Sequence, residues 1–292
     1  MSLLIKNGNI HLEDNTVLKG DLLVEGRKIA KIGKNLKAEA AQTIDAKGLE
    51  VYPGLILPMA NIGMRGMTAL RDKDDTEDRD PINPQLEVRY SFDIRDLAIQ
   101  HMTRLGITSY GLSQGLTPLI AGRMSLINTV GKNFDDLLIK ENFAMKGNFN
   151  RAVMDYYAGR RTMPTTHMAM FYLLDKAFTE AKEYMADEKR STDLQKEALL
   201  PLIKGEIPYM VNVHTVMDIE GIIKVCKKHG VRLVLCGAFQ TDQCADIILE
   251  SGAEVMIGEL NWLMNFLTYE TDMKKLVELY RQGLKFSLLS SG

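Results

Sequence analysis

The sequence predicts an α/β protein in which a small N-terminal β-sandwich lobe precedes a (β/α)8 TIM-barrel-like domain. Three observations support this prediction. From Gly54 onward, short apolar runs alternate with helical patterns, which is typical of βα units in a parallel sheet. Eight such runs occur, the number of strands that a (β/α)8 barrel needs. Residues 1–53 show only short strand patterns separated by turns. We therefore expect two domains, at 1–53 and 54–292.

Within the lobe, residues 3–10 alternate between apolar and polar, with Asn7-Gly8 as a turn signal. Apolar residues flank Glu25-Gly26 between positions 21 and 32, a pattern that predicts a hairpin. In the second domain, the apolar runs predict strands near 55–60, 107–113, 123–130, 142–147, 208–214, 231–237, 254–258 and 284–290. Helical patterns lie near 93–104, 163–187, 192–203, 217–229, 240–251 and 270–282. Pro164 is expected in the first turn of the helix near 163, where a missing amide hydrogen costs little.

Composition and charge exclude several classes of function. The chain has 292 residues, of which 46% are hydrophobic and 25% charged, as in ordinary globular proteins. Its net charge of -2 gives no electrostatic basis for binding nucleic acid or an anionic membrane. No apolar run is long enough to predict a membrane span, and the N-terminus lacks a signal-peptide pattern. Cys226, Cys236 and Cys244 lack a paired spacing, so we expect reduced thiols and a cytoplasmic location.

A long polar segment at 61–92 contains the charged run 71–80. Loops of this length are usually functional or disordered. The spacing lacks the glycine and the terminal glutamate of an EF-hand loop, so we interpret the run as a solvated loop rather than a calcium site.

Residues 51–63 read Val-Tyr-Pro-Gly-Leu-Ile-Leu-Pro-Met-Ala-Asn-Ile-Gly. This segment resembles the turn and first barrel strand of the amidohydrolase superfamily, which usually reads Pro-Gly-Leu-Ile-Asp-x-His-x-His-x-Gly. The framing residues are present, but the acidic position holds Leu57 and the two histidine positions hold Met59 and Asn61. A thioether and an amide do not replace two imidazoles on a hydrolytic zinc. The resemblance therefore implies a metal-dependent hydrolase fold whose first metal ligands are missing.

The resemblance covers nearly the whole chain and is closest to the imidazolonepropionase-like branch. The residues that carry this match lie at 80–84, 106–109, 119–123, 144–146 and 197–208. Relatives hold their metal with His-x-His on strand one, often a modified lysine on strand four, histidines on strands five and six, and an aspartate on strand eight. By this resemblance, the later positions hold Lys146, Asn212, His214, Gly237 and Ser291 or Ser290. A catalytic zinc needs about three protein ligands, so we expect no metal and no other cofactor here.

His214 and Lys146 remain the candidate catalytic residues. His214 could act as a general base at the mouth of the barrel, but no partner acid is visible, which favours a structural role. Lys146 could be a carbamylated ligand, an imine-forming lysine if desolvated, or a cation that lines the pocket. The predicted substrate pocket consists of Met59, Asn61, Lys146, Asn212, His214 and Gly237.

Three hypotheses about function follow. The first is a pseudoenzyme that binds a small molecule, or that supports an active paralogue as a partner subunit in a homo- or hetero-oligomer. The second, implied by the family, is a hydrolase of non-peptide carbon–nitrogen bonds, of the cyclic amide or amidine type, with an altered mechanism. The third is a non-functional fragment, because the resemblance implies a last barrel helix and a returning segment beyond position 292. The expectation is thus a C-terminally shortened barrel that is either naturally short or a fragment.

Overall fold

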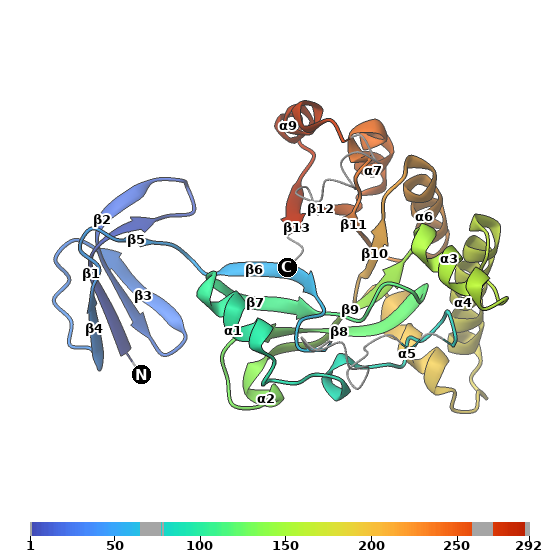
Figure 1. Ribbon diagram of the computed structural model, residues 1–292, viewed down its shortest axis with the longest axis horizontal. Coiled ribbons are helices and arrows are strands. Elements are labelled where there is room, and N and C mark those ends of the chain that lie inside the picture. The colour runs from blue at the N-terminus through green and yellow to red at the C-terminus, as the bar shows by residue number, and fades with distance from the viewer. Residues whose placement is uncertain (1, 65–76, 78, 259–270, 290–292) are drawn as a thin grey trace. The chain divides into compact units, whose positions relative to one another are not determined.

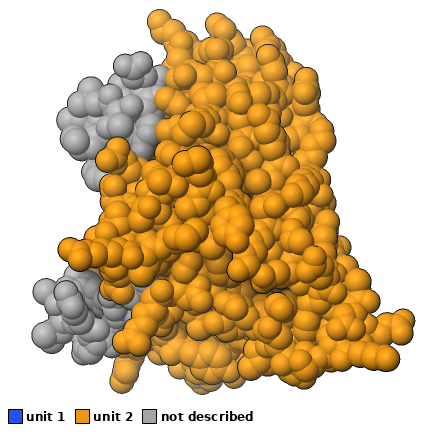
Figure 2. Space-filling model, turned by 90° about the vertical axis from the view of Figure 1, so that its right-hand side faces the viewer, with its two compact units in different colours: residues 1–55 blue, residues 56–292 orange. Residues whose placement is uncertain are grey.

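The computed structural model describes residues 2–64, 77, 79–258 and 271–289 (Figure 1). The chain divides into two compact units, residues 1–55 and 56–292. The boundary lies near the expected break at 53/54. The described surface on view in Figure 2 belongs entirely to residues 56–292. Most of the charged run at 71–80 lies outside the described residues.

The first unit is a five-stranded sheet built around β1 (Ser2–His11). Antiparallel pairing joins β1 to β2 (Val17–Glu25) and β2 to β3 (Lys28–Gly33), which confirms the hairpin at Glu25-Gly26. The short strands β4 (Gln42–Asp45) and β5 (Glu50–Val51) run parallel to β1. The prediction of a turn at Asn7-Gly8 is wrong, because these residues form an irregularity inside β1. Asn7 has a φ of 60°, which asparagine tolerates. Its backbone amide donates to the Asp21 carboxylate at 2.9 Å.

The second unit contains a curled sheet, and all eight predicted strands are confirmed in it (Figure 1). Neighbouring strands in the chain are also neighbours in the sheet. In order, the strands are β6 (Leu55–Ala60), β7 (Ile107–Leu112), β8 (Ile120–Asn128), β9 (Leu138–Asn148), β10 (Tyr209–Val213), β11 (Leu233–Gly237), β12 (Glu254–Gly258) and β13 (Phe286–Leu289).

Strand direction differs from the prediction in the first half of this sheet. The strands from β9 to β13 are parallel, as expected. By contrast, β8 runs antiparallel to both β7 and β9. The connections at 113–119 and 129–137 explain this, because a parallel crossover needs about a dozen residues or more. Strands β7, β8 and β9 therefore form a meander, while the second half consists of βα units.

Helices α3 to α9 flank the second half of the sheet, α1 and α2 lie beside the first half (Figure 1), and most of the helices match the predicted ranges. They are α1 (Leu97–Arg104), α2 (Phe134–Leu137), α3 (Arg151–Gly159), α4 (His167–Ala186), α5 (Leu194–Ile203), α6 (Val216–His229), α7 (Ala245–Ser251) and α9 (Met273–Arg281), with short 3-10 turns η2 (Val88–Tyr90) and η3 (Thr241–Gln243). Because Thr166 caps α4 through its side chain, Pro164 precedes this helix instead of lying in its first turn. Helix α3 was not predicted from the sequence.

The two faces of the sheet bury different side chains. A large aliphatic and aromatic core, including Phe178, Ile222 and Leu235, lies between the sheet and its helices. The inner face carries a smaller cluster rich in sulfur, formed by Met124, Ala144, Met210, Val234, Cys236 and Met256, with Met59 and Phe143 packed against it. We call this group the inner cluster. It lies on the concave side, where a barrel fold packs its interior.

Candidate functional site

Strand register brings three polar or reactive side chains to the inner face. Pairing aligns Met210 with Lys146, and Asn212 with Cys236. Alternate residues of a strand share a face. Because Met210 and Cys236 belong to the inner cluster, Lys146 and Asn212 lie on the same face, toward the carboxyl ends of their strands. Barrel enzymes carry their sites at this end.

Lys146 has an unusual environment for a lysine. Its side chain is 0% exposed, and its Nζ has no hydrogen-bond partner among the described residues. Burial lowers the pKa of Lys146 to about 8, and the neighbouring Cys236 opposes this only in part. A buried cation is normally paired with an acid. Here no described carboxylate forms an ion pair with it.

His214 follows β10 and lies directly above Gly237 in β11. A Cβ at Gly237 would come within 2.5 Å of His214 Cε1 and 3.1 Å of Asn212 Oδ1. The imidazole also contacts the ring of Phe239, with centroids 4.8 Å apart. Burial, together with the charge of Lys146, lowers the pKa of His214 to about 4. The imidazole is therefore neutral at physiological pH.

Backbone hydrogen bonds hold the loops around His214. The amide of Ala238 donates to Val213 O at 2.7 Å, and that of Gln240 donates to His214 O at 3.1 Å. The side chain of Gln240 returns to accept from the amide of Val216 at 2.8 Å. Sequence reasoning missed Phe239 and Gln240. Their place just after a barrel strand was the one available signal, because functional side chains gather on such loops.

The remaining predicted pocket residues are placed less closely. Met59, in β6, is half-buried against the inner cluster. Asn61 begins the turn after β6, and its carbonyl accepts from the amide of Met64 at 3.1 Å. No hydrogen bond joins the Asn61 side chain to the His214 group in the part of the chain that is described. Ser290 and Ser291 lie outside the described residues. The structure thus groups Lys146, Asn212, His214 and Gly237, with Met59 beside the inner cluster.

These residues do not fit the divalent metal that the family resemblance implies. In residues 2–64, 77, 79–258 and 271–289, no three His, Cys, Asp or Glu side chains lie close enough to hold a metal ion. The described residues at the positions that the resemblance assigns to metal ligands offer a thioether, two amides, a glycine, one imidazole and the amine of Lys146. Hard or borderline hydrolytic metals bind such a set poorly.

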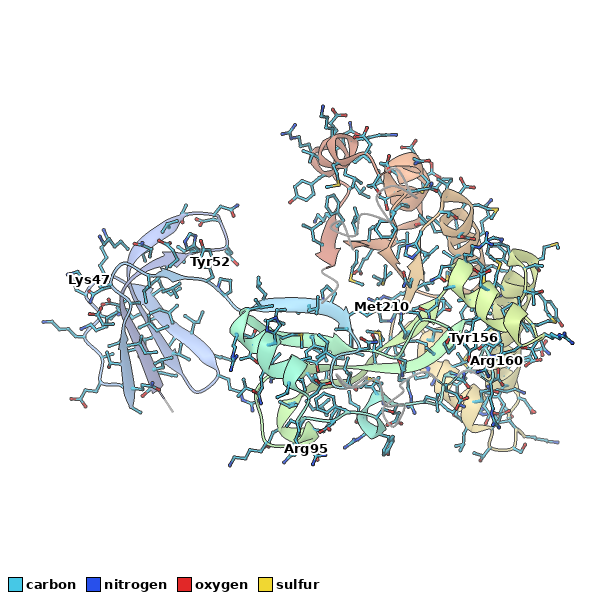
Figure 3. All side chains as sticks on the ribbon, viewed as in Figure 1. Lys47, Tyr52, Arg95, Tyr156, Arg160 and Met210 are labelled. Carbon is cyan, nitrogen blue, oxygen red and sulfur yellow. The ribbon has the colours of Figure 1, made fainter. Side chains whose placement is uncertain are left out.

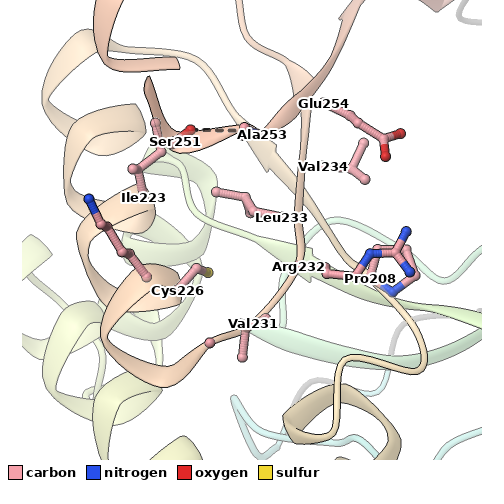
Figure 4. Close-up of a pocket in the computed structure, with 13 residues that line it drawn as sticks. Pro208, Ile223, Cys226, Val231, Arg232, Leu233, Val234, Ser251, Ala253 and Glu254 are labelled. Carbon is pink, nitrogen blue, oxygen red and sulfur yellow. Dashed lines mark hydrogen bonds between the residues drawn. The ribbon is translucent and has the colours of Figure 1, made fainter. Parts of the chain in front are cut away.

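Two hollows of the second unit lie nearer the amino ends of the strands than this group does. The first, about 260 Å³ in volume, is lined by Pro208, Cys226, Arg232, Leu233, Glu254 and others at the amino ends of β11 and β12 (Figure 4). Burial raises the pKa of Cys226 to about 12, so its thiol is unreactive. This hollow lies at the end of the strands opposite to His214.

The second hollow, about 680 Å³ in volume, opens onto the inner face. We call it the inner cleft. Its apolar lining includes Pro58, Phe143, Met210, Val234 and Met256, and basic residues such as Lys140 and Arg232 also line it. Figure 3 shows Met210 on β10 within this curled part of the sheet. The cleft therefore reaches the inner cluster from the amino ends of the strands, and Lys146, Asn212 and His214 are not part of its lining.

Comparisons with known proteins agree with this architecture. The chain is 48% identical over 56 residues to a dihydroorotase from Bacillus cytotoxicus, a match covering 19% of this chain and 13% of the relative. It is 47% identical over 57 residues to a 5-methylthioadenosine/S-adenosylhomocysteine deaminase from Thermococcus sibiricus, covering 19% and 13%. Both matches thus span about an eighth of the relative's length. No family model matches the chain.

Among solved structures, an amidohydrolase from Thermotoga maritima has the same fold. Its TM-score is 0.89 at 24% identity, and the match covers 98% of this chain and 78% of the other. The shared fold and the local sequence matches support the resemblance of this chain to the amidohydrolase superfamily. The assignment to the imidazolonepropionase-like branch stays a prediction. None of the described helices is both long and apolar enough to cross a lipid bilayer.

Proposed function

We propose that this chain is an amidohydrolase-family pseudoenzyme that binds a small molecule on the inner face of its curled sheet, without a hydrolytic metal. The observation that carries this proposal is the composition of the ancestral site. Met59, Asn212 and Gly237 occupy positions where relatives carry ligands, and His214 is the lone imidazole of the group. Such a site can bind and orient a ligand, but it lacks a means to activate water through a metal.

The chemistry of the group suits a small organic ligand. A neutral imidazole offers one donor and one acceptor, and the amide of Asn212 adds both kinds. On the same face, nearer the amino ends of the strands, the inner cleft has an apolar lining with a few polar groups, which is the usual character of small-molecule sites.

A second candidate function is hydrolysis of a non-peptide carbon–nitrogen bond, of the cyclic amide or amidine type, by an altered mechanism. The observation that favours it is the pair of shifted pKa values, about 4 for His214 and about 8 for Lys146. A neutral imidazole can accept a proton from water, and perturbed pKa values gather at functional sites.

Elemental analysis of the purified chain, combined with assays on dihydroorotate and hydantoin, separates the two candidates. The pseudoenzyme proposal expects less than stoichiometric zinc, manganese or iron, and no turnover. Metal-independent turnover that is lost in His214→Ala, but kept in the exposed-histidine control His101→Ala, would support the altered hydrolase. Stoichiometric metal whose removal abolishes turnover would contradict both.

We also propose a cytoplasmic protein that associates with a second copy or with an active paralogue. All three cysteines are free thiols, which supports the location. Leu55 and Ile56 of β6 and Leu288 of β13 are 61%, 67% and 62% exposed at the two outer strands of the sheet. Exposed apolar strands of this kind usually need cover.

Light scattering of the purified chain that shows only a stable monomer would contradict self-association, and failure of a paralogue to co-purify would contradict the heteromeric form.

A further inference from the structure

We propose that the inner cleft binds a medium-length aliphatic monocarboxylate, with the Arg232 guanidinium on the carboxylate and the chain along the apolar wall. This inference rests on the proposed small-molecule binding, and it gives the ligand a place on the inner face and a chemical class. Among the described residues that line the cleft, none stands at a position that the resemblance assigns to a metal ligand. The site is therefore separate from the group around His214.

The apolar wall of the cleft is the first step in the argument. Phe143, Met210, Val234 and Met256 line the cleft from four neighbouring strands, β9 to β12. Met210, Val234 and Met256 are at most 7% exposed, so they form a packed floor. The volume of about 680 Å³ lies in the range that is usual for small-molecule sites. Because methionine is unbranched and adapts its shape, this wall suits a flexible aliphatic chain.

The charged rim beside this wall is the second step. Strand pairing aligns Val234 with Glu254, and alternate residues of a strand share a face. Arg232 and Glu254 therefore lie on the same face as Val234 and Met256, each nearer the amino end of its own strand. Figure 4 shows the side chains of Arg232, Val234 and Glu254 on the side of these strands that faces away from Cys226 of α6. A ligand with one charged end and an apolar body can span the rim and the wall.

The charges that line the cleft have a positive excess. Three are basic and two are acidic, namely Lys140, Arg232 and Lys285 against Glu206 and Glu254. All five side chains are exposed, and none of them forms an ion pair with a described residue. One surplus positive charge suits a ligand with a single negative charge.

Arg232 is the basic residue that is best placed for the carboxylate. It directly precedes β11, whereas Lys140 on β9 and Lys285 before β13 lie two strands away on either side. The guanidinium is a planar fork of donors that matches a carboxylate with two hydrogen bonds, while a lysine acts as a point charge. We therefore expect Arg232 to hold the carboxylate and the two lysines to add a weaker, longer-range attraction.

Calorimetric titration of the full chain at pH 7 tests the proposal, with octanoate as the probe. Octanoate is ionised there, because carboxylic acids titrate near about pH 4 to 5. We expect octan-1-ol and octylamine, which have the same chain, to bind at least about tenfold more weakly than octanoate. Hexanoate lacks two methylene groups and should bind about fifteenfold more weakly, because each buried methylene contributes about fourfold in affinity.

Arg232→Gln and Glu254→Gln are the paired variants, because they change the rim charge in opposite directions. Arg232→Gln should weaken octanoate binding at least about tenfold and leave octan-1-ol binding unchanged. Glu254→Gln should strengthen octanoate binding about twofold to fivefold, because it removes a repelling charge. Arg27→Gln, at an exposed position in the first unit, is the matched control and should change neither affinity. Thermal unfolding of the variants shows whether the fold is intact.

Three results would overturn the monocarboxylate proposal. They are no measurable binding of octanoate, binding of octylamine or octan-1-ol that equals or exceeds that of octanoate, and unchanged octanoate affinity in a folded Arg232→Gln variant.

This inference and the proposed function fail in different ways. Absent octanoate binding in a chain that holds no metal and shows no turnover overturns only the ligand class. Stoichiometric metal with metal-dependent turnover overturns the pseudoenzyme, whatever the octanoate result.

Discussion

At the scale of single residues, Lys146 and His214 have the same physical cause for their shifted pKa values. Burial disfavours the charged form of each, and the charge of Lys146 disfavours a second charge on His214. The family resemblance led to both residues, because it placed them at ligand positions. The sequence did not reveal that Lys146 would be fully buried and without a hydrogen-bond partner among the described residues. That depends on which side chains of neighbouring strands face it.

The stability of Lys146→Met should report this burial directly. The pKa of Lys146 falls from 10.5 to about 8 on folding, which corresponds to about 3 kcal/mol of destabilisation below pH 8. Between about 8 and 10.5 the unfolded chain binds more protons, so the stability of the wild type rises with pH. Lys146→Met should therefore be about 3 kcal/mol more stable near pH 7, and this gain should vanish near pH 10.5.

Urea unfolding at several pH values measures this difference. Lys140→Met, at an exposed position, should change the free energy of unfolding by less than about 0.5 kcal/mol at each pH. A Lys146→Met variant that is less stable than the wild type at pH 7 would show that the amine has a stabilising partner.

At the scale of elements, the strands and most helices followed from periodicity, whereas their directions did not. The β8 strand has the apolar pattern of a barrel strand, and only the short connections at 113–119 and 129–137 make it antiparallel. Helix α3 was missed because its polar residues and short length hide the helical period. The close contact between the loop after β10 and the end of β11 could not be predicted either, because it depends on how His214 packs against Gly237.

Gly237→Ala tests this approach. Gly237 has a φ of +81°, and an added methyl group would overlap the His214 ring. We expect a loss of about 3 kcal/mol, part from the left-handed backbone and part from the clash. Gly252→Ala is the control, because Gly252 has a φ of +69° with nothing within 4 Å of the added Cβ. It should lose only about 1 kcal/mol.

The same glycine variants made in a His214→Ala background separate the cost of the left-handed backbone from the cost of the clash. Thermal or urea unfolding measures the loss of stability in each case. There, Gly237→Ala should lose no more than Gly252→Ala, because the ring that it meets is gone. An equal loss for both glycine variants in the wild-type background would contradict the packing of His214 on Gly237.

At the scale of the whole molecule, our proposal is that the amidohydrolase fold is kept while positions that bind metal in relatives are changed on several strands. The double variant Met59→His/Asn61→His should therefore not hold zinc tightly, because His214 alone would join the two new imidazoles while Asn212 and Gly237 still supply no imidazole or carboxylate. Dialysis against zinc followed by elemental analysis measures this, with the wild type as the reference. Stoichiometric zinc in the double variant would mean that further ligands exist in the folded chain.

The sequence by itself determined the fold class and the eight strands of the sheet, and it predicted changed ligand positions on strands one, five and six. These follow from local periodicity and from motif residues, which belong to single elements. Only the tertiary structure decided the direction of β8, the contact of His214 with Gly237 and the isolation of the Lys146 amine. Each of these depends on side chains far apart in the chain, and burial among such neighbours sets both packing and pKa.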